Sequence, residues 1–158
     1  MVRATSSKPS MKRENGEGAS DVQRVVVDAN VLLSFIVHRN EKQRDVVKAL
    51  LLSAEAGEMV AIVPQFVVFE VVYVLQSTYR ISGLEVKAMI RDLVGLPGVL
   101  LIDECPWKRV LDLWPAPLPS LADAALASVA ANSRYDAVAT FDQKLAKRLK
   151  NLGVASYW

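Results

Sequence analysis

The sequence has little of the chemistry on which many hydrolytic enzymes depend. Its 158 residues include one cysteine, Cys105, and one histidine, His38. A single cysteine forms no internal disulfide, which fits a reducing cytosol, and one Cys with one His does not make a structural zinc site. Hydrolysis by a histidine pair is excluded, and a Ser-His-Asp or Cys-His site would have to use His38. That residue stands between "SFIV" and "RNEK", which predicts an exposed helix end.

Phosphate-binding loops and long apolar runs are also missing. The stretch "GLPG" at residues 95–98 lacks the spacing of a glycine-rich phosphate loop. The most apolar stretch, residues 60–75, is broken by Pro64, Gln65 and Glu70 and falls short of the ~18 apolar residues that a membrane helix needs. No apolar segment follows the basic residues near the N-terminus, so we expect no secretory signal and a cytoplasmic protein.

The net charge of +2 arises near the N-terminus. Residues 1–24 hold five Lys or Arg and three Asp or Glu, and the remaining 14 basic and 14 acidic residues cancel. Only a local basic patch would therefore attract a polyanion. The stretch "KLAKRLK" offers one, because Lys144, Lys147 and Arg148 have the spacing of one helix face. A solvated helix face is the alternative interpretation.

The organisation of the chain predicts one folded domain after a tail. Residues 1–22 are polar, rich in Ser, Gly and charge, which predicts a flexible N-terminal tail. Residues 23–158 are long enough for one domain with a substantial core. We expect strands at residues 24–28, 60–63, 99–102 and 137–140, with a fifth candidate at 154–158. We expect helices at residues 30–37, 41–56, 65–79, 82–95, 106–114, 120–133 and 142–151.

Continuous apolar strands that alternate with helices predict an α/β fold, a central, mostly parallel β-sheet flanked by α-helices on both faces. Ser82 and Ser120 are expected N-caps, each with an acid three residues later as in a capping box. Gly57 and Gly153 are expected to end helices. In such a sheet the working site lies at the carboxyl ends of the strands, and Asp28 ends the first expected strand.

Four of the 17 acidic residues stand in apolar surroundings. They are Asp28 in "VVVDANVLL", Glu70 in "FVVFEVVYVL", Asp123 in "LADAALASVA" and Asp142 in "AVATFDQKLA". Four isolated buried carboxylates would each be costly, whereas a cluster at the sheet edge would share a solvated pocket and a cation. Clustered carboxylates without a Lys or Arg nearby favour a hard divalent ion, Mg²⁺ or Mn²⁺, bound through oxygen.

Each acid also has an explanation that needs no metal. Asp123 and Asp142 would suit the first turn of a helix, where a negative charge offsets the helix dipole. Glu70 would form an ion pair across an interface, and Asp28 would cap the following helix. We expect Asn30 to hold the turn or orient Asp28 rather than to bind metal.

In order and spacing, the four acidic stretches resemble the motifs of PIN-domain nucleases, whose commonest small members are VapC-type toxins of toxin–antitoxin pairs. The resemblance covers residues 24–158 and implies a PIN-like fold. It implies a catalytic, metal-binding role for Asp28, Glu70, Asp123 and Asp142. Asn30 and Thr140 match polar positions of the motifs, whereas Ala29 stands where many relatives carry Ser or Thr. Asp136, the nearest spare acid, is expected in a turn before a strand.

The resemblance implies a ribonuclease that uses Mg²⁺ or Mn²⁺ to hydrolyse RNA phosphodiester bonds. Lys144, Lys147 and Arg148 would then bind RNA phosphates. We expect a toxin with a cognate antitoxin, and the alternative is an RNA-processing enzyme or a non-toxin module of a larger RNA-handling complex. A phosphatase of the haloacid dehalogenase type would need a second Asp where Asn30 stands.

The apolar stretches between residues 65 and 95 exceed what one sheet face needs to cover it. We therefore expect a homodimer, as the resemblance also implies, and a further groove for an antitoxin helix or strand. Trp107, Trp114 and Trp158 are expected to be packing residues rather than platforms on which bases stack.

Overall fold

The computed structural model describes residues 22–158, which form four strands and seven helices. The predicted N-terminal tail lies, except for Val22, outside the described residues. The division into tail and domain stays a prediction, although the first strand does begin at Gln23.

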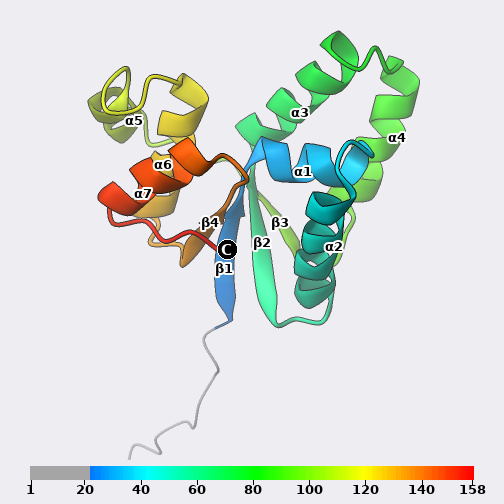
Figure 1. Cartoon of the computed structure of the whole chain (residues 1–158), viewed down its shortest axis with the longest axis horizontal. Coiled ribbons are helices and arrows are strands. Elements are labelled where there is room, and N and C mark those ends of the chain that lie inside the picture. The colour runs from blue at the N-terminus through cyan, green and yellow to red at the C-terminus, as the bar shows by residue number, and fades with distance from the viewer. Residues whose placement is uncertain (1–21) are drawn as a thin grey trace, which may run out of the picture.

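The four strands form one parallel sheet at the centre of the molecule (Figure 1). They are β1 (Gln23–Val27), β2 (Met59–Pro64), β3 (Val99–Ile102) and β4 (Ala137–Ala139). Their order across the sheet is β3-β2-β1-β4, and every pairing is parallel. The three valines of β1 are fully buried, as expected for a strand covered on both faces.

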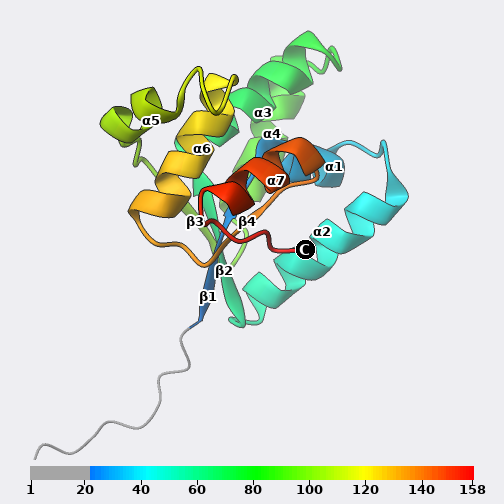
Figure 2. The same cartoon turned by 60° about the vertical axis from the view of Figure 1, so that its left-hand side comes forward.

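Seven helices cover the sheet on both faces, as predicted. They are α1 (Ala29–Ile36), α2 (Glu41–Glu55), α3 (Gln65–Ser77), α4 (Gly83–Val94), α5 (Trp107–Leu113), α6 (Leu121–Asn132) and α7 (Gln143–Asn151). Helices α1 to α4 lie on one side, and α6 and α7 lie side by side on the other, with α5 next to α6 (Figure 1 and Figure 2). The predicted α/β fold class is confirmed. No helix in residues 22–158 combines the length and apolar character needed to cross a bilayer.

Local chemistry sets the ends of the helices. Ser82 and Glu85 form the predicted capping box at the start of α4. At α6 only half of the predicted box is present among the described residues: Ser120 Oγ accepts a hydrogen bond from the Asp123 amide, without a return bond from the Asp123 carboxylate. Gly98 has a φ of +75°, and a Cβ there would lie 2.2 Å from the Ala54 carbonyl oxygen, so only glycine fits.

The fifth strand candidate, residues 154–158, is wrong as a strand. This segment pairs with β4 through one parallel bridge, Val138 to Ser156. The Trp158 indole N–H then donates to the Thr140 carbonyl oxygen at 3.0 Å instead of extending the ladder. The segment therefore covers the free edge of β4 without adding a full strand.

Candidate active site

The four acids predicted from the sequence lie around the carboxyl end of the sheet. Asp28 directly follows β1, and Asp142 lies just after β4. Glu70 lies in α3, which begins directly after β2, and Asp123 lies in the first turn of α6. Asp28 and Asp142 each act electrostatically on the pKa of Asp123, and Asp28 and Asp123 act on that of Glu70. The four carboxyl groups therefore share one electrostatic environment.

The order of the strands explains why Asp28 and Asp142 meet. Strand β2 lies on one side of β1 and β4 on the other, so the direction in which the sheet grows reverses beside β1. The helices that follow the two strands cover opposite faces, with α1 after β1 and α7 after β4 (Figure 1). At such a reversal a crevice opens beyond the carboxyl ends of the strands, which is the usual ligand site of open α/β sheets.

Both of these acids also cap helices, as the alternative explanation predicted. Asp28 Oδ1 accepts a 2.7 Å hydrogen bond from the Ala29 amide at the start of α1. Asp142 Oδ1 accepts from the amides of Lys144 at 2.8 Å and Leu145 at 3.0 Å at the start of α7. The caps hold each carboxylate at the end of a strand, and they use one oxygen of each group.

The second oxygen of Asp28 is held by two neutral side chains. Asp28 Oδ2 accepts from Asn30 Nδ2 at 2.8 Å and from Thr140 Oγ at 2.7 Å. The amide orientation of Asn30 is fixed, because its Oδ1 accepts a 3.1 Å hydrogen bond from the Phe141 backbone N–H. Asn30 thus orients Asp28, as the sequence led us to expect, and ties it to the segment after β4.

Thr140 is the most buried polar residue of this network, with 1% of its surface exposed. Its hydroxyl donates to Asp28 Oδ2 and accepts from Asn30 Nδ2 at 3.2 Å and from the Asp142 amide at 3.1 Å. A hydroxyl has one hydrogen and two lone pairs, so its bonding capacity is fully used. One buried side chain therefore links Asp28 to Asp142.

Burial and mutual repulsion raise the pKa values of three of the acids. Burial raises the pKa of Asp123 to about 6, with smaller contributions from the charges of Asp28 and Asp142. Burial and then the Asp142 charge raise the pKa of Asp28, while its hydrogen bonds lower it. Glu70 occupies an exposed position on α3, yet partial burial of its carboxyl group and the charges of Asp28 and Asp123 raise its pKa as well. The site concentrates negative charge in an environment that disfavours it.

The chain with this site matches a known protein family. The family model described as PIN domain matches residues 25–151, a span that contains all four acids. The chain belongs to the PIN domain family. The resemblance inferred from the four acidic motifs is confirmed.

Solved structures share this PIN fold. VapC20 of Mycobacterium tuberculosis, a sarcin-ricin loop cleaving toxin, superposes with a TM-score of 0.60 at 15% identity, over 78% of this chain and 94% of that one. PAE2754 of Pyrobaculum aerophilum gives 0.59 at 18% identity, over 94% and 92%. A domain of a functionally unknown protein from Methanocaldococcus jannaschii gives 0.53 at 20% identity, over 86% and 90%. No curated protein sequence matches significantly. At these identities the structural likeness shows the fold.

One cation lies closer to the acids of this PIN domain than expected. The charge of Arg148, which is half-buried on α7, lowers the pKa of Asp123. The expectation that no Lys or Arg lies near the acids is therefore wrong, because α7 places Arg148 close enough to Asp123 for their charges to interact. Lys144 and Lys147 are exposed on the same helix.

The acids do not form a closed metal-binding shell. Within residues 22–158, no three Asp, Glu, His or Cys side chains are grouped closely enough to hold one metal ion as they stand. Asp136, the spare acid, lies at the opposite end of β4, where its Oδ2 accepts a hydrogen bond from the Arg24 amide at 2.6 Å. His38 is exposed, as predicted.

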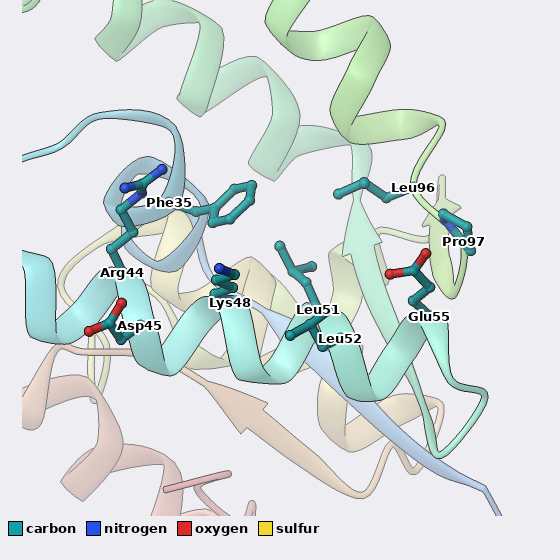
Figure 3. A pocket seen from close by; sticks show the side chains of 9 residues that line it. All are labelled: Phe35, Arg44, Asp45, Lys48, Leu51, Leu52, Glu55, Leu96 and Pro97. Carbon is teal, nitrogen blue, oxygen red and sulfur yellow. The ribbon is translucent and has the colours of Figure 1, made fainter.

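Another pocket of the PIN domain lies away from the acids, along α2. It measures about 310 Å³, and its walls combine apolar side chains, among them Phe35, Leu51 and Leu96, with the charged residues Lys48 and Glu55. Figure 3 shows most of its side chains arising from α2, with Phe35 from α1 and Leu96 from the segment before β3. The pocket has no residue in common with the acidic site.

Two contributors to the site were not predicted from the sequence. The Phe141 amide fixes Asn30, and Trp158 contacts the same segment through its hydrogen bond to Thr140 and by stacking on Phe141. The expectation that the three tryptophans are packing residues is only partly correct: Trp158 packs on Phe141 but is 39% exposed, and Trp107 and Trp114 are 56% and 40% exposed. The contact of Trp158 with Phe141 depends on how the last residues cross the edge of β4.

Proposed function

We propose that this PIN domain is a metal-dependent endoribonuclease that hydrolyses RNA phosphodiester bonds. The observation that carries the proposal is the convergence of Asp28, Glu70, Asp123 and Asp142 at the reversal point of a PIN-family sheet. Such a concentration of carboxylates raises its own pKa values unless a cation offsets the charge. A dedicated cation site explains why the fold keeps these groups together.

The chemistry of the donor set fits Mg²⁺ or Mn²⁺, and the side chains would have to draw together around the ion, because within residues 22–158 no three of them are grouped closely enough to hold it. All four ligands would bind through oxygen, which hard divalent ions prefer. Asp28 accepts three hydrogen bonds, so about one of its roughly four lone-pair positions remains for a metal. When bound, the ion would polarise a phosphodiester and lower the pKa of an attacking water. We assign its binding to Asp28, Glu70, Asp123 and Asp142.

The other residues of the site orient the acids, offset their charge or bind the RNA. Asn30 and Thr140 keep Asp28 facing the crevice through their hydrogen bonds. Arg148 offsets part of the charge on Asp123. Lys144 and Lys147 on the exposed side of α7 contact RNA phosphates, so the acidic site does not repel the whole substrate.

The toxin interpretation is the finer part of the proposal. VapC20, which shares the fold, is a sarcin-ricin loop cleaving toxin, and this supports a VapC-type toxin with a cognate antitoxin, acting on cellular RNA in the cytoplasm. The alternative is an RNA-processing enzyme or a module of a larger complex. A small antitoxin gene beside the gene for this chain, together with growth arrest on expression, favours the toxin.

Two surfaces suit protein partners. The pocket along α2 is lined by apolar side chains and by charges of both signs, among them Lys48 and Glu55, which fits an amphipathic antitoxin helix with complementary charges. On α3 and α4, Phe69, Tyr73 and Leu84 are 70%, 71% and 78% exposed. These three side chains form the surface at which we propose the homodimer.

Cleavage assays test the enzyme proposal. Purified chain, freed of any partner, is expected to cut total cellular RNA with Mg²⁺ or Mn²⁺, to stop in EDTA, and to lose activity in Asp123→Asn. The matched control is Asp136→Asn, which removes an acid at the other end of β4. Cleavage that continues unchanged after chelation, or in Asp123→Asn, would contradict the proposal.

A further inference from the structure

A second groove lies between α7 and the C-terminal residues 154–158. It measures about 630 Å³ and is lined by small side chains together with Lys147, Lys150, Gln143 and Trp158. Among the described residues that line it there is no Asp or Glu. The groove thus presents two cations and one aromatic side chain to solvent, in contrast to the acidic site beside it.

The groove is built onto the segment that carries the acids. The Trp158 ring stacks on Phe141 with a centroid distance of 5.0 Å and an interplanar angle of 20°. Its indole N–H donates to the Thr140 carbonyl oxygen at 3.0 Å. Thr140 and Phe141 directly precede Asp142, and Gln143 directly follows it. The groove therefore begins at Gln143, the residue next to Asp142 of the acidic site.

The lining matches a single strand of nucleic acid. Lys ammonium groups bind phosphates, and single-strand sites combine such groups with an aromatic side chain against which a base stacks. Trp158 keeps 39% of its surface exposed after packing on Phe141, so part of the indole is free for this contact. Lys147 and Lys150 are three residues apart on α7, so the two cations are neighbours on one face of the helix.

We propose that this groove binds the nucleotides next to the cleaved bond of single-stranded RNA, with phosphates at Lys147 and Lys150 and a base against Trp158. The inference rests on the proposed ribonuclease function and assigns a path to its substrate. RNA held at the acids continues along α7 rather than toward the pocket on α2.

Binding measurements test the two lysines without requiring cleavage. The probe is a fluorescein-labelled single-stranded RNA of 12 nucleotides, titrated with the full chain in EDTA while anisotropy is recorded across a salt series. Each single-strand phosphate contact contributes about 0.7 to the salt slope, so Lys147→Ala/Lys150→Ala is expected to lower the slope by about 1.4 and to weaken binding. The matched control is Lys42→Ala/Lys87→Ala, which removes two exposed lysines from α2 and α4. A slope that falls equally in both double variants would overturn the proposal.

A second measurement tests the role of Trp158 in base stacking. The same RNA with all bases removed from the central positions is compared with the intact RNA. The wild-type chain is expected to prefer the intact RNA by at least about fivefold, and Trp158→Leu is expected to lose that preference. Trp158→Phe keeps an aromatic ring and is expected to retain it in part, which covers the case in which Trp158→Leu does not fold. Equal preference in the wild type and Trp158→Leu would overturn this part.

The two proposals fail in different ways. If the chain is not a nuclease, the wild type does not cleave RNA with Mg²⁺ or Mn²⁺, whatever the binding data show. If the groove assignment is wrong, the wild type cleaves RNA, and both lysine double variants bind and cleave it alike.

Discussion

Thr140 Oγ donates a 2.7 Å hydrogen bond to Asp28 Oδ2 across 112 positions of the chain. This bond joins the residue after β1 to the residue after β4, at the point where the sheet reverses its direction of growth. The same hydroxyl accepts from the Asp142 amide. One buried hydroxyl therefore contacts both halves of the acidic site, and the Phe141 amide reinforces the link through Asn30.

Replacing Thr140 by Val tests this link. Valine has nearly the same shape but leaves the Asp142 amide and one of the two Asn30 Nδ2 hydrogens without an acceptor, and it removes one donor from Asp28 Oδ2. We expect a loss of about 1–3 kcal/mol in the free energy of unfolding, together with lower nuclease activity. Urea unfolding measures the first, and Thr140→Ser, which keeps the hydroxyl, is the control. A Thr140→Val protein as stable and active as the wild type would show that the bond is unimportant.

Replacing Asp28 by Asn is expected to destabilise the protein even without metal. The amide has one oxygen, so its NH₂ group must face either the Ala29 amide or the donors Asn30 and Thr140. A donor facing a donor in a half-buried site costs about 1–3 kcal/mol. Thermal melts in EDTA at pH 7 measure the difference. An unchanged or higher midpoint would mean that relief of charge repulsion outweighs these hydrogen bonds.

Replacing Asp123 by Asn, unlike replacing Asp28, is not expected to lower stability in EDTA at pH 7, because the Asp123 carboxylate accepts no hydrogen bond from residues 22–158. Its pKa of about 6 lies above the value of an unfolded chain, so the folded state holds the proton more tightly. The stabilisation from this proton is full below about pH 4 and is lost as the pH rises through about 6. In EDTA, Asp123→Asn is expected to reduce the fall in melting temperature between pH 4 and 7 and to melt at or above the wild type at pH 7. A pH dependence identical to that of the wild type would remove Asp123 from the charge cluster.

With Mg²⁺ bound, the wild type is expected to melt at a higher temperature than Asp123→Asn, the reverse of their order in EDTA. Mg²⁺ binds the folded site and stabilises it by linkage, by about 2.7 kcal/mol at a concentration one hundred times the Kd. The wild-type midpoint is therefore expected to rise with Mg²⁺, and that of Asp123→Asn to rise much less. Differential scanning calorimetry over a Mg²⁺ series measures both. Equal shifts in the two proteins would place the ion elsewhere.

Replacing the exposed aromatic pair on α3 tests the proposed dimer. Phe69 and Tyr73 are four residues apart on one helix face. Phe69→Ser/Tyr73→Ser is expected to yield a monomer at micromolar concentration, whereas Leu52→Ser, at an exposed position on α2, leaves the assembly unchanged. Light scattering coupled to size-exclusion chromatography measures the mass. A wild-type monomer, or a dimer that survives the double substitution, would contradict the assignment.

The sequence by itself determined the elements of this protein and the identity of its four acids. Short apolar runs such as the three valines before Asp28 are typical of strands buried on both faces, so the four strand positions and the parallel α/β class followed from local pattern. Ser82, Gly57 and Gly153 marked helix ends, because capping depends on residues only a few positions apart. Asp28, Glu70, Asp123 and Asp142 stood out because a charge among apolar neighbours needs a reason.

Only the tertiary structure decided how those acids are held and what lies beside them. The links from Thr140 to Asp28, from Phe141 to Asn30 and from Trp158 to Thr140 join segments distant in sequence or depend on the exact path of a turn. The position of Arg148 near Asp123 likewise follows from the packing of α7 beside α6. Hydrogen bonds and charge pairs act over a few ångströms, and the distances that separate such residues are set by strand order and helix packing, which no local pattern encodes.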